Sequence, residues 1–88
     1  MPQTVRVKLS RPADAAGILV DMTARGLDGE LEPMDLGMSI VLASHNGDAE
    51  GFERRVWLAL EDSIAERGLP FVPMAEDERS FSLRPALA

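Results

Sequence analysis

Apolar side chains recur every four positions through the second half of the chain, at Phe52, Val56, Leu60 and Ile64. This spacing places them on one face of an α-helix, with Trp57 and Ala59 beside them. The Asn46-Gly47-Asp48 segment predicts the helix start, because its polar side chains can cap free amides, and Gly68-Leu69-Pro70 predicts its end. A helix with one apolar face must bury it against another layer, and this need constrains the rest of the chain.

Alternating apolar and polar residues predict the strands of that second layer. The first strand is expected from Thr4 to Leu9, where Val5, Val7 and Leu9 share one side. The other four are expected in two hairpins, over residues 27–32 with 38–44 and over residues 71–74 with 80–84. Turns at residues 33–37 and 75–78 join them. Phe81 and Leu83 are expected to face inward.

A second helix is predicted between the first two strands. Ser10-Arg11-Pro12 suits a helix start, because proline needs no amide donor in the first turn, and Gly26 follows the predicted end at Arg25. Its packed face consists of Ala15, Ile18, Leu19 and Met22. Asp14, Asp21 and Arg25 are expected on the solvent side, with Asp21 and Arg25 one turn apart.

The resulting element order is βαββαββ. It predicts one α+β domain over residues 1–88, a ferredoxin-like two-layer sandwich (βαββαβ) with an extra C-terminal strand. The sheet is expected to be antiparallel, with both helices on one face.

Charge and residue usage narrow the function classes. The formal net charge is -6 and the basic residues are scattered, which disfavours binding to nucleic acid or to an anionic membrane. The absence of cysteine excludes disulfides and thiolate metal sites. No signal peptide or membrane-spanning run is recognised, so we predict a cytoplasmic protein. A domain this small gains stability by self-association, which favours a homodimer.

Candidate catalytic and metal-binding groups are few. His45, the single histidine, lies in a predicted loop, where a solvated side chain is the simplest interpretation. Ser44, His45 and Asp48 are too close in sequence to align as a hydrolytic triad. The acidic groups at residues 30–35 and 76–78 lack the spacing of a calcium loop. The sequence therefore predicts no metal or cofactor and favours a protein that is not an enzyme.

Candidate interface residues lie on the predicted sheet face opposite the helices. Arg6, Lys8 and Arg84 share this face, as in RNA-binding sandwiches, but the base-stacking aromatics of those proteins are missing. We therefore predict protein contacts through Arg6, Lys8, Val41 and Ala43. Leu58 is a further candidate, because it points away from the apolar stripe of its helix.

The stretch from Arg11 to Asp28 resembles the opening of an ACT domain, a small regulatory module of many amino-acid enzymes. The resemblance rests on Arg11-Pro12, on the apolar helix positions and on Gly26-Leu27-Asp28. The family's glycine after the proline is Ala13 here. The resemblance implies an amino-acid or other small effector bound at a dimer interface, by Arg11, Pro12, Ala13, Asp14, Gly26 and Asp28.

Three functional hypotheses follow. The first is a non-catalytic interaction module that pairs with itself or with another protein through its open sheet face or a strand edge. The second is an ACT-like small-molecule sensor. The third is an enzyme whose site is assembled across a dimer from His45 and acidic residues of the other chain.

Overall fold

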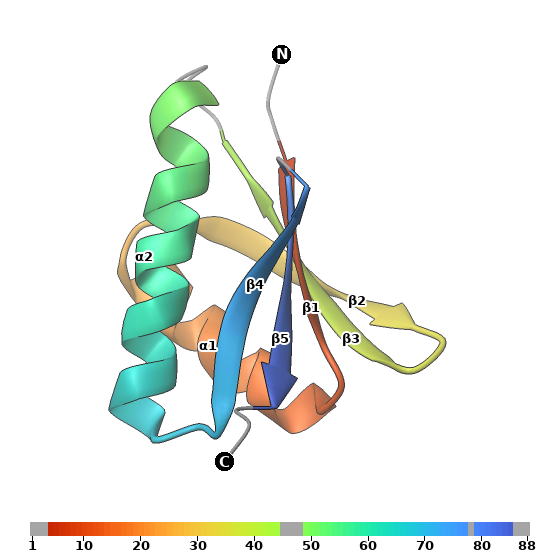
Figure 1. The fold of residues 1–88 in the computed structure, drawn as a ribbon. Helices are drawn as coiled ribbons and strands as arrows, with labels where there is room; N and C mark the ends of the chain where they lie inside the picture. The colour runs from red at the N-terminus through yellow and green to blue at the C-terminus, as the bar shows by residue number, and fades with distance from the viewer. Residues whose placement is uncertain (1–3, 45–48, 78, 86–88) are drawn as a thin grey trace.

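Five strands and two helices make up the computed structural model, which describes residues 4–44, 49–77 and 79–85 (Figure 1). In chain order they are β1 (Thr4–Leu9), α1 (Pro12–Ala24), β2 (Asp28–Met34), β3 (Gly37–Ala43), α2 (Ala49–Arg67), β4 (Phe71–Asp77) and β5 (Ser80–Pro85). The predicted α+β element order is therefore confirmed. The turn between β2 and β3 is shorter than expected, because both strands extend into residues 33–37.

All five strands form one sheet in the order β2-β3-β1-β5-β4. β1 pairs antiparallel with β3 but parallel with β5, so the expectation of an antiparallel sheet is wrong and the sheet is mixed. The reason lies in the last hairpin. β5 turns back from β4 and inserts between β4 and β1. Because β4 runs antiparallel to β1, the strand that reverses it must run parallel to β1.

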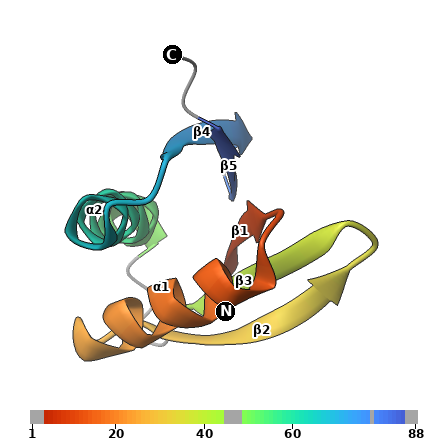
Figure 2. The same ribbon diagram turned by 90° about the horizontal axis from the view of Figure 1, so that it is seen from below.

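Both helices lie on the same side of the curved sheet, as expected (Figure 2). α1 meets the sheet where Leu19 approaches Gly29 of β2. α2 meets it where Trp57 packs edge-to-face on Phe81, with ring centroids 5.1 Å apart. The core between these layers contains the predicted stripe of α2 and the inward side of β1, and its residues Val5, Val7, Ile18, Met22, Val56 and Leu60 are fully buried. Burial of these apolar side chains holds the two layers together.

One apolar residue on the helix side of the sheet is only partly covered. Leu31 lies on the same side of β2 as Leu27 and pairs with the buried Ile40, but Leu31 is 37% exposed whereas Leu27 is buried. The turn end of the β2–β3 hairpin projects beyond α1 (Figure 1).

Candidate functional site

The sheet face opposite the helices carries three distinct rows of side chains. β2 contributes an acidic row, Asp28, Glu30 and Glu32; β3 contributes a small uncharged row, Ser39, Val41 and Ala43; and β1 contributes a row with two cations, Thr4, Arg6 and Lys8. Strand pairing aligns these rows in register. Glu30 lies beside Val41 and Val41 beside Arg6, while Glu32, Ser39 and Lys8 form the next level. No helix of the described residues covers this face (Figure 2).

Arg6 reaches across the small row to the acidic one. Its Nη1 lies 3.1 Å from Glu32 Oε1 and donates a second hydrogen bond, of 2.9 Å, to Ser39 Oγ. The Ser39 hydroxyl in turn donates to the backbone carbonyl of Glu32 at 3.1 Å. Ser39 is fully buried beneath this arrangement. The arginine is thus held flat over β3, which is possible because the β3 side chains are small.

Lys8 reaches in the opposite direction. Its Nζ donates to Glu76 Oε2 at 2.8 Å, across β5 to the edge strand β4. This hydrogen bond, together with the Ser82 hydroxyl and the charge of Arg84, lowers the pKa of Glu76. Arg84 lies on the same face as Ser82 by strand alternation. The cations of the face are therefore central, with carboxylates toward both edges of the sheet.

A shallow open hollow of about 320 Å³ lies on this face. Val41 and Ala43 form its small apolar part, and Thr4, Asp28, Gly29 and Glu30 surround them. Short side chains leave room here for side chains of another surface.

Four of the five predicted interface residues meet on this face. Arg6 and Val41 are directly paired across β1 and β3, with Lys8 and Ala43 on the same side. Leu58 does not join them. It lies on α2, is 47% exposed, and borders a separate hollow of about 190 Å³ with Arg25, Leu27, Arg55 and Ala59. Leu58 belongs to the helical layer, so it lies on the other side of the sheet from the open face.

The predicted effector residues divide into two groups. At the start of α1, Arg11 Nε lies 2.8 Å from Asp14 Oδ2, and the Arg11 guanidinium lies 5.5 Å from the ring centroid of Phe71. Pro12 is the first residue of α1 and Ala13 is exposed. These contacts tie the start of α1 to β4.

Gly26 and Asp28 lie at the other end of α1. Gly26 has a φ of 84°, which favours glycine and ends the helix, and Asp28 begins β2. A helix of 13 residues is about 20 Å long, so one copy of the chain does not bring the two groups together. The ACT-like effector site stays a prediction, and it would have to form between copies.

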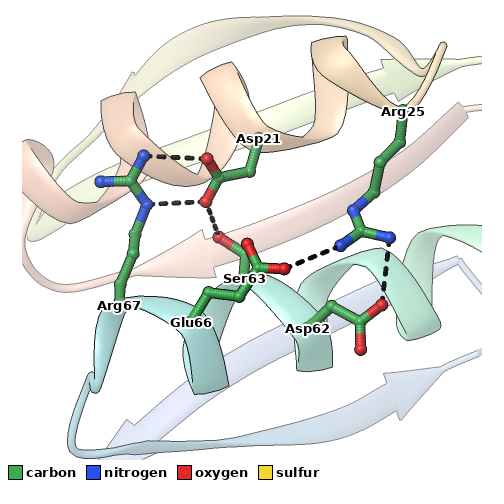
Figure 3. Close-up of polar contacts among 6 residues, drawn as sticks. All are labelled: Asp21, Arg25, Asp62, Ser63, Glu66 and Arg67. Atoms are coloured by element: carbon green, nitrogen blue, oxygen red, sulfur yellow. Dashed lines mark hydrogen bonds and ion pairs between the residues drawn. The ribbon is translucent and has the colours of Figure 1, made fainter.

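A polar network between the helices was not predicted (Figure 3). Asp21 Oδ2 accepts hydrogen bonds from Ser63 Oγ and from Arg67 Nε, and the Arg67 contact is the main reason that the pKa of Asp21 falls to about 2. Arg25 pairs with Asp62 at 3.1 Å and with Glu66 at 3.3 Å. The expectation that Asp21 faces solvent on the free side of α1 is therefore wrong, because α2 packs alongside it.

Chemistry-bearing clusters are sparse in the described ranges. Residues 4–44, 49–77 and 79–85 contain no group of three or more histidine, cysteine or acidic residues placed to hold a metal ion. His45 and the Asn46-Gly47-Asp48 cap lie outside these ranges. Neither described helix is long and apolar enough to cross a membrane. The cytoplasmic location stays a prediction.

Comparisons with known proteins found no match. This holds for models of protein families, for curated proteins and for solved structures.

Proposed function

We propose that this protein is a non-catalytic interaction module that pairs with a second copy of itself through the open sheet face. The observation that carries the proposal is the order of the three rows on that face. An acidic row on β2 and the cations of β1 flank the small uncharged row of β3. Such a face carries, on one chain, both the acidic and the basic residues that a self-complementary interface needs.

The charge balance of the whole chain favours this face over the rest of the surface. The formal net charge is -6, so two copies repel one another on average. On the open sheet face, Arg6, Lys8 and Arg84 lie between the carboxylates of β2 and Glu76 of β4. Two copies can meet here with less repulsion, and with attraction where opposite charges align.

Pairing through a strand edge is less favourable. The two outer strands are β2 and β4. Each contains a proline, Pro33 in β2 and Pro73 in β4, and a proline supplies no backbone N–H to an added strand. Pairing of β2 with its own copy would also place Glu30 and Glu32 beside like charges. These features favour the face.

The fold supports a second part of the proposal, that the chain is a ferredoxin-like sandwich widened by one strand. Without β5, the remaining elements follow the βαββαβ order, with both helices on one side of an antiparallel set of strands. Insertion of β5 widens the sheet and so enlarges the face available for pairing.

Sedimentation velocity or light scattering over a wide concentration range tests the pairing. Three strands of about seven residues cover roughly 14 Å by 23 Å, which is small for a stable interface, so concentrations should extend to about 1 mM. We expect a reversible dimer. Val41→Lys should abolish it by placing a charge in the middle of the face.

Leu58→Lys is the matched control, because it adds the same charge to an exposed apolar position on the helical side. It should leave the dimer intact. A wild-type chain that stays monomeric throughout the range, or a Val41→Lys variant that dimerises as well as wild type, would refute the proposal.

A further inference from the structure

We infer that the two copies pair about a twofold axis that runs along β3, so that each acidic row lies opposite the cations of the partner. This inference rests on the proposed function and specifies its geometry. The occupant of the open face is then a second copy of the chain, held in one arrangement.

The register of the strands determines which residues would meet. A twofold axis above β3 and parallel to it exchanges the β2 side of one copy with the β1 side of the other, while each level along the strands is kept. Glu30, Val41 and Arg6 share one level, so Glu30 lies opposite Arg6 of the partner subunit. At the next level Glu32 lies opposite Lys8 of the partner subunit. Symmetry makes each contact occur twice.

The axis itself runs over the small row. Val41 faces Val41 of the partner subunit, with Ala43 beside it, whereas Ser39 lies beneath the Arg6 side chain. The short, uncharged side chains of Val41 and Ala43 allow the sheets to approach closely at this end of β3. Aligned packing of two twisted sheets keeps their strands within about 30° of one another, so the central rows stay in contact.

Other twofold arrangements bring like charges together. An axis across the strands would place β2 on β2, with Glu30 and Glu32 against the same carboxylates of the partner. An axis along β1 would place Arg6 and Lys8 against themselves. An axis along β5 would do the same to Arg84. Like charges in direct contact are destabilising, so the axis along β3 is favoured.

Arg6 and Glu30 are both able to form the predicted contact. Arg6 uses Nη1 for both Glu32 and Ser39 within the described residues, which leaves its Nε and Nη2 donors for a second carboxylate. Glu30 is exposed and makes no ion pair with any residue in the described part of the chain. Dimerisation would give Glu30 an ion-pair partner and Arg6 a second carboxylate besides Glu32.

Site-directed cross-linking tests the position of the axis. The sequence has no cysteine, so a single introduced cysteine is an unambiguous probe. Packed sheets lie about 10 Å apart, so Val41→Cys should cross-link with a bifunctional thiol reagent of similar length. Met74→Cys is the control, because Met74 is also exposed and on the same face but lies on β4. β4 is three strands from β3, which separates the two Met74 positions by about 29 Å, beyond the reach of the reagent.

The two cysteine variants separate failure of the axis from failure of the proposed function. If Met74→Cys cross-links and Val41→Cys does not, the axis is wrong although the face still pairs. If the wild-type chain is monomeric and neither variant cross-links, the pairing itself fails.

Charge exchange gives an independent test. One variant, Glu30→Lys with Glu32→Lys, has cations on both sides of β3. The other, Arg6→Glu with Lys8→Glu, has carboxylates on both sides. Each variant alone should have a dimer dissociation constant at least tenfold higher than that of wild type. An equimolar mixture should regain a mixed dimer, because each contact then joins opposite charges. Circular dichroism checks that both variants fold. A mixture of folded variants that stays monomeric under conditions where wild type dimerises would overturn the inference.

Discussion

The Arg67 guanidinium binds the Asp21 carboxylate through two hydrogen bonds, from Nε to Oδ2 at 2.7 Å and from Nη2 to Oδ1 at 2.9 Å (Figure 3). The contact joins the last turn of α2 to the C-terminal part of α1. The Ser63 hydroxyl donates a third hydrogen bond to the same carboxylate. The network therefore fixes how the two helices lie against one another on their side of the sheet, leaving the opposite face free.

Replacement of Asp21 by asparagine should destabilise the fold. The substitution removes the charge that both donors recognise, and the free energy of unfolding should fall by roughly 1 kcal/mol, since the pair is partly exposed to solvent. Urea unfolding at neutral pH measures the change. Asp62→Asn is the control, because Arg25 keeps Glu66 as a partner. An equal loss in both variants would argue against a special role for Asp21.

The same contact predicts a pH dependence. The pKa of Asp21 is lowered from 3.8 to about 2, mainly by the hydrogen bond from Arg67. A carboxyl group with a depressed pKa in the folded state stabilises the fold fully above its unfolded pKa and loses this contribution as the pH falls. The stability difference between wild type and Asp21→Asn should therefore be constant near neutral pH and shrink between about pH 4 and pH 2. A difference that does not change over this interval would contradict the assignment.

Gly17 and Arg67 should be energetically coupled. A Cβ at position 17 would lie 2.7 Å from Arg67 Nη1, so Gly17→Ala must displace the guanidinium from Asp21. Alanine in a helix is otherwise favoured over glycine by about 1 kcal/mol. The substitution should give this full gain in an Arg67→Ala background and clearly less in wild type. A double-mutant cycle in urea measures the coupling, and equal gains in both backgrounds would exclude it.

Gly37 should tolerate no side chain. Its φ is 131°, and a Cβ there would lie 2.1 Å from the carbonyl oxygen of Leu9. Gly37→Ala should cost more than about 2 kcal/mol, because the backbone itself must move. Gly26→Ala is the matched control: φ is also positive, at 84°, but the space is open, so its cost should stay near 1 kcal/mol. Thermal or urea unfolding that ranks the two variants in the opposite order would refute the close contact.

Substitutions of two leucines on α2 should have sharply different effects on the free energy of unfolding. Leu60 is fully buried and Leu58 is 47% exposed. Leu60→Ala should lower the free energy of unfolding by about 3 kcal/mol, through lost burial and a cavity, whereas Leu58→Ala should change it by less than about 1 kcal/mol. Equilibrium unfolding of both variants checks this. Similar losses would mean that Leu58 is covered in solution, for example by a partner on the helical side.

Local signals in the sequence predicted the elements themselves. The period of Phe52, Val56, Leu60 and Ile64 predicted α2, and Pro12 with Gly26 marked the limits of α1, because a helix start, a helix end and an apolar stripe each depend on residues within a few turns. Alternation likewise predicted β1 with its observed bounds. The same alternation placed Arg6 and Lys8 on the face away from the helices.

Tertiary structure decided which strands, helices and side chains are neighbours in the fold. Period-2 alternation says which residues share a side of their own strand, but not that β5 inserts between β1 and β4, nor that Glu30, Val41 and Arg6 share one level. Asp21 and Arg67 are 46 positions apart, and only the packing of α1 on α2 brings them together. The entropic cost of closing a loop rises only slowly with loop length, so sequence separation discriminates weakly among alternative long-range pairings. Burial of the shared core selects one of them, and with it the charge pattern of the open face.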